Sequence, residues 1–185
     1  MSRTRTVVFT IGHGTRSIDD FVALMQGAGV RRLVDVRTAP GSRKHPQFGK
    51  DALAEALAAH GIAYRWERDL GGFRKPRADS RHTALRNAGF RGYADHMETE
   101  PFRAARDRLV RTAREAPTVC MCAESLWWRC HRRLLADSLT AASCDVLHVM
   151  EGGRTEPHRL TGSARVEDST PVYDVPEQQQ ELLGD

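Results

Sequence analysis

Short apolar runs alternate with amphipathic stretches along most of the chain, and this alternation constrains the fold more than any other feature. The expected strands are rich in β-branched residues and cover Val7–Ile11, Leu33–Val36, Ile62–Trp66, Thr118–Cys122 and Asp145–Met150. The first expected helix begins after Ser17, and the others cover Asp51–His60, Phe102–Arg114 and Arg129–Leu139. Strands that alternate with helices form a mostly parallel sheet covered on both faces. We therefore expect a single three-layer α/β domain with about five strands.

The chain of 185 residues has the length of one domain. We assign residues 1–165 to this domain and residues 166–185, which are polar and rich in glutamine, to a C-terminal tail or arm. The long basic stretch Leu70–Gly92 is expected to be a surface loop with at most a short helix. It either follows a nucleic-acid backbone or is simply solvated.

Composition restricts the class of protein. A hydrophobic fraction of 40% and a charged fraction of 28% are typical of globular proteins. No apolar run approaches the ~18–20 residues that a membrane span needs, and the N-terminus enters a strand without a secretory hydrophobic region. We therefore expect a cytoplasmic protein that does not engage a membrane. In such a chain the cysteines are not expected to form a disulfide framework, and Cys120 and Cys144 are expected to be buried small side chains.

The charge is positive and is carried mostly by arginine. The net charge is +4, the pI is about 9.1, and only Lys44, Lys50 and Lys75 are lysines. Because arginine binds phosphate and carboxylate through two parallel hydrogen bonds, this charge permits an anionic small molecule or a nucleic acid as partner.

The segment Val119–Asp137 concentrates reactive side chains in one strand–loop–helix unit. Cys122 ends the expected strand, Glu124 lies in the loop, and His131 lies near the start of the helix. A cysteine facing a helix N-terminus can have its pKa lowered from about 8.5 to roughly 3.5–7.5. Cys122 is therefore a candidate nucleophile, with His131 as base and Glu124 as orienting group. In the alternative, Cys122 is a core thiol and His131 a helix cap.

Parallel strands bring further candidates to the same edge of the sheet, because ligands bind beyond the carboxyl ends of the strands. His13 follows the first strand, and Asp35 and Arg37 end the second. We interpret Asp35 as an acid–base carboxylate, and Arg37 and Arg129 as groups that hold an anion. Alternatively, Asp35, Arg37 and Arg129 form ion pairs within the protein. The turn around His13 lacks the later glycine of a dinucleotide-binding motif, so NAD binding is not expected.

Two other readings of the central segment stay open. Trp127 and Trp128 either stack on a flat ligand such as a base or cover the site as an apolar lid. Cys122, Cys130 and His131 can be combined into a metal site, although their spacing matches no zinc-binding pattern. We assign no metal ligands and leave the cofactor unknown.

Eight motifs in order along residues 8–165 resemble the proteins of the domain of unknown function 488 family. They are Thr10–His13 with Thr15, Leu33–Arg37, Pro40–Arg43 with Pro46–Phe48, Leu70–Gly72, Phe90–Ala94, Cys122–Glu124, Trp128–Arg132 and His158–Leu160. The resemblance implies a single α/β domain and an enzyme-like cluster, but no particular reaction. Gly14 departs from the serine expected in that turn. From these motifs we add Thr15, Ser42, Trp128 and His158 to the candidate substrate-binding residues.

A weaker similarity links the chain to rhodanese and to cysteine phosphatases. In those proteins, too, Asp-Val-Arg ends a strand and a strand-end cysteine precedes an anion-binding loop. Their loops have the spacing Cys-x5-Arg and several small residues. The interval from Cys122 to Arg129 is one residue longer and contains both tryptophans.

The sequence thus predicts an enzyme, a hydrolase or group transferase, that acts on a phosphate-bearing or nucleic-acid-related substrate. The candidate catalytic residues are Cys122, Glu124, His131 and Asp35. The candidate substrate-binding residues are His13, Thr15, Arg37, Ser42, Trp128, Arg129 and His158. The alternatives are a non-catalytic nucleic-acid-binding module and a metal-binding protein that uses Cys122, Cys130 and His131. The oligomeric state is not assigned.

Overall fold

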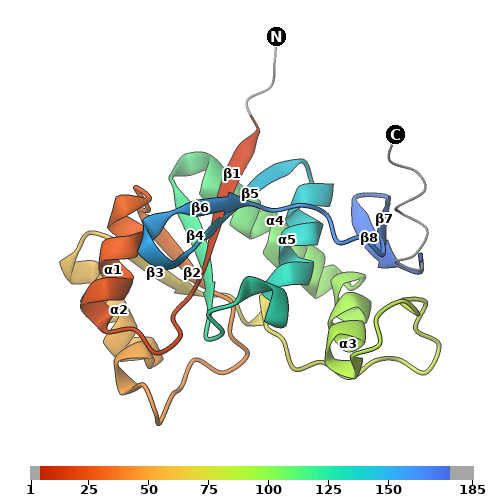
Figure 1. Cartoon of the computed structure of the whole chain (residues 1–185), viewed down its shortest axis with the longest axis horizontal. Helices are drawn as coiled ribbons and strands as arrows, with labels where there is room; N and C mark the ends of the chain where they lie inside the picture. The colour runs from red at the N-terminus through yellow and green to blue at the C-terminus, as the bar shows by residue number, and fades with distance from the viewer. Residues whose placement is uncertain (1–4, 176–185) are drawn as a thin grey trace.

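A six-stranded, mostly parallel sheet forms the centre of the computed structural model, which describes residues 5–175 (Figure 1). Its strands are β1 (Thr6–Gly12), β2 (Arg32–Asp35), β3 (Ala63–Trp66), β4 (Thr118–Cys122), β5 (Cys144–Val149) and β6 (Thr155–Pro157). Their order across the sheet is β3-β2-β4-β1-β5-β6, and only β6 runs antiparallel to its neighbour. The expected parallel α/β sheet is confirmed, with one strand more than expected.

Five helices cover the two faces of this sheet (Figure 1). Helices α1 (Ile18–Gly27) and α2 (Lys50–Ala59) pack on one face, and α3 (Ala88–Met97), α4 (Glu100–Glu115) and α5 (Arg132–Ala141) pack on the other. The side chain of Ser17 caps α1 by accepting a hydrogen bond from the Asp20 amide at 3.1 Å, as its sequence position predicts. None of the described helices is long and apolar enough to cross a membrane.

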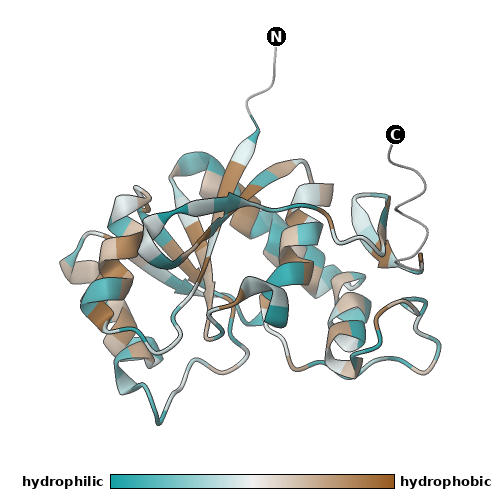
Figure 2. Cartoon of the chain, viewed as in Figure 1, coloured by the Kyte–Doolittle hydropathy of each residue, from teal (hydrophilic) through white to brown (hydrophobic). Residues whose placement is uncertain are grey.

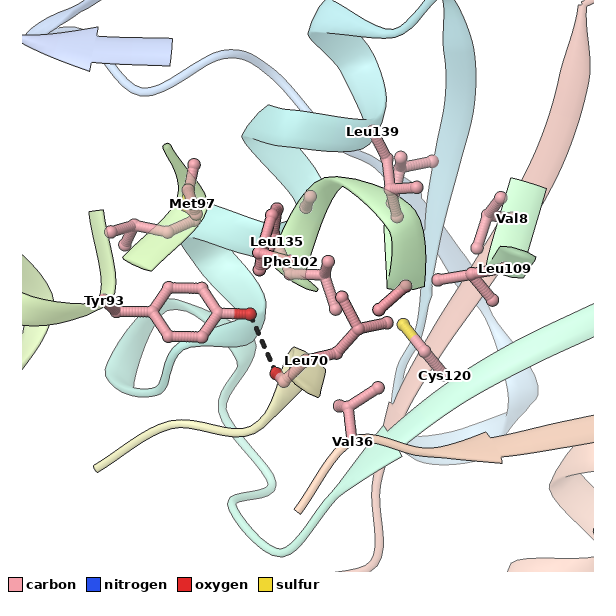
Figure 3. Close-up of a cluster of buried hydrophobic side chains, with 14 of the residues drawn as sticks. Val8, Val36, Leu70, Tyr93, Met97, Phe102, Leu109, Cys120, Leu135 and Leu139 are labelled. Atoms are coloured by element: carbon pink, nitrogen blue, oxygen red, sulfur yellow. Dashed lines mark hydrogen bonds between the residues drawn. The ribbon is translucent and has the colours of Figure 1, made fainter. Parts of the chain in front are cut away.

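Each face of the sheet has its own core, because successive side chains of a strand point to opposite faces. Val119 and Met121 of β4 pack with α1 and α2, whereas Cys120 and Cys122 pack with α4 and α5. Figure 2 shows apolar residues along the central strands and a mixture of apolar and polar residues in the helices on either side. In the core next to α4, drawn in Figure 3, the Tyr93 hydroxyl donates to the carbonyl of Leu70 at 2.9 Å. Cys122 therefore faces α5.

The start of helix α5 and the presence of strand β6 differ from the expectation. Helix α5 begins at Arg132, not at Arg129, because a short 3-10 helix, Trp127–Arg129, and an extended Cys130 (φ −133°, ψ 173°) come first. Strand β6 lies outside the strands that the sequence predicts. Its three residues are all exposed, so it has no apolar alternation by which it could be recognised.

The chain continues beyond β6 into a two-stranded hairpin formed by β7 (Ala164–Glu167) and β8 (Thr170–Tyr173). Asp168 and Ser169 both have positive φ, as a tight hairpin turn requires. Tyr173 is fully buried, and its hydroxyl donates to Asp137 of α5 at 2.8 Å. The segment that we assigned to a tail thus begins inside a packed hairpin. Its residues 176–185, like residues 1–4, lie outside the described part of the chain.

Candidate functional site

A cavity of about 760 Å³ lies at the carboxyl ends of β1, β2 and β4. The loops that follow these three strands enclose it, and they lie along the lower edge of the sheet in Figure 1. The candidate residues that line the cavity are His13, Thr15, Arg37, Ser42, Cys122, Glu124 and His131. The structure therefore brings together seven candidate side chains, of which His13, Arg37 and Cys122 are among those that the sequence placed at one sheet edge.

Two thiols lie at the base of this cavity. Cys122 ends β4, Cys130 immediately precedes the first turn of α5, and their sulfur atoms are 3.2 Å apart. The Nε of Arg132 donates to the Cys122 sulfur at 2.9 Å and lies 3.4 Å from the Cys130 sulfur. From the sequence, Cys130 was a candidate only as a metal ligand, and Arg132 was not among the candidate site residues.

Arg132 is a buried cation. It is 1% exposed, and its other hydrogen bonds reach the hydroxyl of Thr10 and the carbonyl oxygens of Glu124 and Ser125. No carboxylate within residues 5–175 forms an ion pair with it. Because a buried charge is strongly destabilising without a counter-charge, one of the two thiols is expected to be a thiolate.

The surroundings of the two sulfurs show which thiol ionises. A hydrogen bond from the Cys122 thiol, together with the charge of Arg132, lowers the pKa of Cys130 to about 6. Burial raises the pKa of Cys122 well above its usual value. Cys130 is therefore the more acidic thiol of a pair that shares one negative charge beside Arg132.

The geometry of the loop after Cys122 differs from that of a phosphate-binding loop. The carbonyl oxygens of Glu124 and Ser125 point inward and accept hydrogen bonds from the Arg132 guanidinium, which occupies the centre of the loop. A phosphocysteine or persulfide loop instead directs backbone N–H groups toward its centre. The weak similarity to rhodanese and cysteine phosphatases thus does not extend to the loop geometry.

Two neutral histidines line the cavity. His13 donates from Nδ1 to the carbonyl of Gly14 at 2.8 Å, and His131 donates from Nε2 to the carbonyl of Val36 at 2.9 Å. Burial lowers the pKa of each to about 4. Since a carbonyl can only accept, these bonds leave His13 Nε2 and His131 Nδ1 as the unprotonated nitrogens. Both rings can accept a proton, and neither carries a charge at neutral pH.

Asp35 and Arg37 form an internal ion pair. Arg37 donates from Nε to Oδ1 of Asp35 at 2.9 Å and from Nη2 to Oδ2 at 2.5 Å. The Tyr64 hydroxyl donates to the same carboxylate at 2.7 Å. Asp35 is completely buried and does not line the cavity, so its visible role is to position Arg37 at the wall.

Three other candidates lie away from the cavity. Arg129 is exposed on the 3-10 helix, and Trp128 is 42% exposed beside Trp127. His158 belongs to a buried network, in which it contacts His148 at 3.0 Å and Asp137 at 2.8 Å. Because α5 begins three residues later than expected, Arg132 reaches the thiols and Arg129 does not.

The arginines of Leu70–Gly92 are largely engaged within the protein. Arg77 and Arg81 pair with Glu98, both at 2.6 Å, and Arg91 donates to the carbonyl of Leu85. This pairing reduces the positive charge that the segment presents to a nucleic-acid backbone.

One group of side chains in residues 5–175 has the spacing of a metal site, namely His82, Asp95 and Glu98. Its chemistry does not suit a metal ion. His82 Nδ1 accepts from the Tyr173 amide at 3.3 Å, which leaves the proton on the Nε2 that faces the carboxylates. Arg77 and Arg81 already neutralise Glu98. Cys122, Cys130 and His131 do not form such a group within residues 5–175.

Comparison with known proteins identifies one family. The family model described as "Domain of unknown function DUF488" matches residues 17–139, which extend from the cap of α1 into α5 and include both thiols and Arg132. No curated protein and no solved structure matches the chain.

Proposed function

The chain belongs to the DUF488 family, and from its cavity we propose that it is a thiol-dependent hydrolase or group transferase acting on a phosphate-bearing substrate. One observation carries this proposal. A buried guanidinium that forms no ion pair with a carboxylate of residues 5–175 contacts two sulfur atoms 3.2 Å apart at the base of an open cavity. This arrangement stabilises a thiolate where a substrate can reach it.

In this proposal Cys130 is the nucleophile, in place of the Cys122 that the sequence favoured. Its thiolate attacks phosphorus, an S–P bond forms, and the leaving oxygen departs and takes a proton from solvent. Water, or an acceptor hydroxyl, then displaces the sulfur while His13 Nε2 accepts its proton. The Cys130 thiolate is regenerated, and Cys122 donates a hydrogen bond to it throughout.

Cationic side chains supply the recognition of the substrate. Arg37, fixed by Asp35, and Arg43 and Lys44 of the loop after β2 line the cavity together with a single carboxylate, Glu124. An anionic group is therefore favoured at this wall. The rival nucleic-acid-binding module has less support, because Arg77 and Arg81 of its expected footprint pair with Glu98.

The test is turnover of a panel of phosphomonoesters, phosphodiesters and nucleotides by three cysteine variants. We expect Cys130→Ser to lower kcat/KM by about 10³-fold or more and to abolish a phosphoryl adduct that acid quenching traps on that residue. Cys144→Ser, at a buried thiol of β5 outside the cavity, is the matched control and should retain activity. Cys122→Ser should retain part of the activity and shift its pH profile upward. Full turnover by Cys130→Ser would refute the mechanism.

A further inference from the structure

Phe73 is the most exposed large hydrophobic side chain among the described residues. It is 97% exposed, and it lines the mouth of the thiol-containing cavity. Its backbone has φ +55°, a conformation that side-chain-bearing residues rarely adopt. The protein therefore keeps an apolar ring in solvent, in a backbone conformation that favours glycine or asparagine. Residues under such strain cluster at ligand sites.

The chain on both sides of Phe73 is immobilised. Before it, a Cβ on Gly71 would lie 2.7 Å from the Thr38 side chain, and one on Gly72 would lie 3.0 Å from the His131 ring. After it, a Cβ on Gly92 of α3 would lie 2.3 Å from the carbonyl oxygen of Arg74. These close approaches leave no room for side chains at the three glycines, so the backbone that presents Phe73 is packed in place.

Hydrogen bonds reinforce this frame. The Thr38 hydroxyl donates to the carbonyl of Gly72 at 2.7 Å, and Arg74 Nε donates to the carbonyl of Gly71 at 3.2 Å. The buried Tyr93 hydroxyl donates to the carbonyl of Leu70 at 2.9 Å (Figure 3). The exposed ring thus stands on a rigid support, which is how a pre-organised binding surface is built.

We propose that Phe73 is a stacking platform for the base of a nucleotide substrate. The same cavity provides Arg43 and Lys44, which suit a phosphate, and an aromatic face at its mouth, which suits a flat ring. A nucleotide joins these two chemistries in one molecule. The inference rests on the function proposed above only for the position of the reacting bond near Cys130.

The experiment compares two ligands that share sugar and phosphate and differ in the base, adenosine 5′-monophosphate and ribose 5-phosphate. Calorimetry on the reduced full-length protein measures the Kd of each for the wild type, Phe73→Asn and Val166→Ala. Asparagine tolerates positive φ, so the first variant removes the ring and keeps the loop. Val166 is an exposed apolar residue outside the cavity and is the matched control.

We expect Phe73→Asn to weaken binding of the nucleotide about 5- to 150-fold and to leave ribose 5-phosphate unchanged. Its Tm should equal or exceed that of the wild type, because the strain at φ +55° is relieved. Val166→Ala should leave both Kd values unchanged. Equal affinity of the wild type for the two ligands, no binding of either, or an equal loss for both in Phe73→Asn would overturn the proposal.

Binding and turnover, both measured on Phe73→Asn and on Cys130→Ser, separate this inference from the thiol mechanism. Base-selective binding that requires Phe73, combined with turnover that does not require Cys130, would retain the platform and remove the thiol mechanism. Turnover that depends on Cys130, without base selectivity, would remove the platform alone.

Discussion

At the scale of single residues, the proposed thiol chemistry depends on Arg132. Its guanidinium is buried and contacts sulfur, hydroxyl and carbonyl groups, so its charge is balanced by the Cys130 thiolate. His13 and His131, which line the cavity, are neutral and cannot replace this cation. The most reactive thiol is therefore the one that the neighbouring guanidinium and thiol stabilise as an anion.

This charge balance predicts how cysteine alkylation depends on pH. The pKa of Cys130 is lowered to about 6, so its iodoacetamide reaction rate should rise with a midpoint near pH 6 and level off above pH 7. Peptide mapping of the reduced native protein measures the rate at each cysteine. Cys120, whose pKa burial raises to about 12, should stay unlabelled over this range. A Cys130 midpoint near the usual value of about 8.5 would contradict the assignment.

At the scale of elements, close backbone approach assembles the site. Strand β1 ends at Gly12, where a Cβ would lie 1.8 Å from the carbonyl oxygen of Glu124 and 2.8 Å from Nη2 of Arg132. The loop after β4 therefore packs directly against the end of β1, and this contact positions Arg132. A second network, from Thr10 through His148 and His158 to Asp137, joins β1 and β5 to α5 behind the site.

A glycine pair tests this close packing. Gly12→Ala should lower the free energy of unfolding by about 2 kcal/mol or more, because the added methyl meets backbone that cannot move aside. Gly27→Ala, at the end of α1 with no atom within 4 Å of the added Cβ, should be neutral or stabilise by up to about 1 kcal/mol. Urea denaturation measures both. Equal effects of the two substitutions would show that the contact at Gly12 is not tight.

At the scale of the whole molecule, the parallel sheet brings distant segments to one rim. The cavity is lined by residues of the loops after β1, β2 and β4, and also by Gly72 and Phe73. Several titratable groups are buried in the process, and His13, His131 and His148 are among the histidines that burial keeps neutral. Burial lowers the pKa of His13 and His131 to about 4 and that of His148 to about 3.

These lowered pKa values predict acid sensitivity. Between pH 6.5 and pH 4 the unfolded chain binds protons that the folded protein does not, so the free energy of unfolding falls as the pH falls. We expect a loss of at least about 3 kcal/mol between pH 7 and pH 4, which urea denaturation at several pH values would measure. A constant free energy over this range would contradict the neutral state of the three rings.

Much of the architecture follows from local sequence. The apolar run Thr118–Cys122 matches β4, and the cap at Ser17 begins α1, because strand alternation and capping depend on residues close in the chain. The edge strand β6 has no such pattern, since all three of its residues are exposed. The hairpin of β7 and β8 becomes visible only through the burial of Tyr173 against α5.

By itself, the sequence determined that His13, Arg37, Cys122 and Glu124 share one edge of a parallel sheet, because the order of strands and helices dictates where the strand ends lie. Only the tertiary structure decided which groups surround the two sulfur atoms. The late start of α5 directs Arg132 to the sulfurs and leaves Arg129 in solvent, and the lowered pKa of Cys130 arises from the hydrogen bond of Cys122 and the charge of Arg132. Those quantities depend on contacts between β4, α5 and the loop that joins them, and no local pattern encodes them.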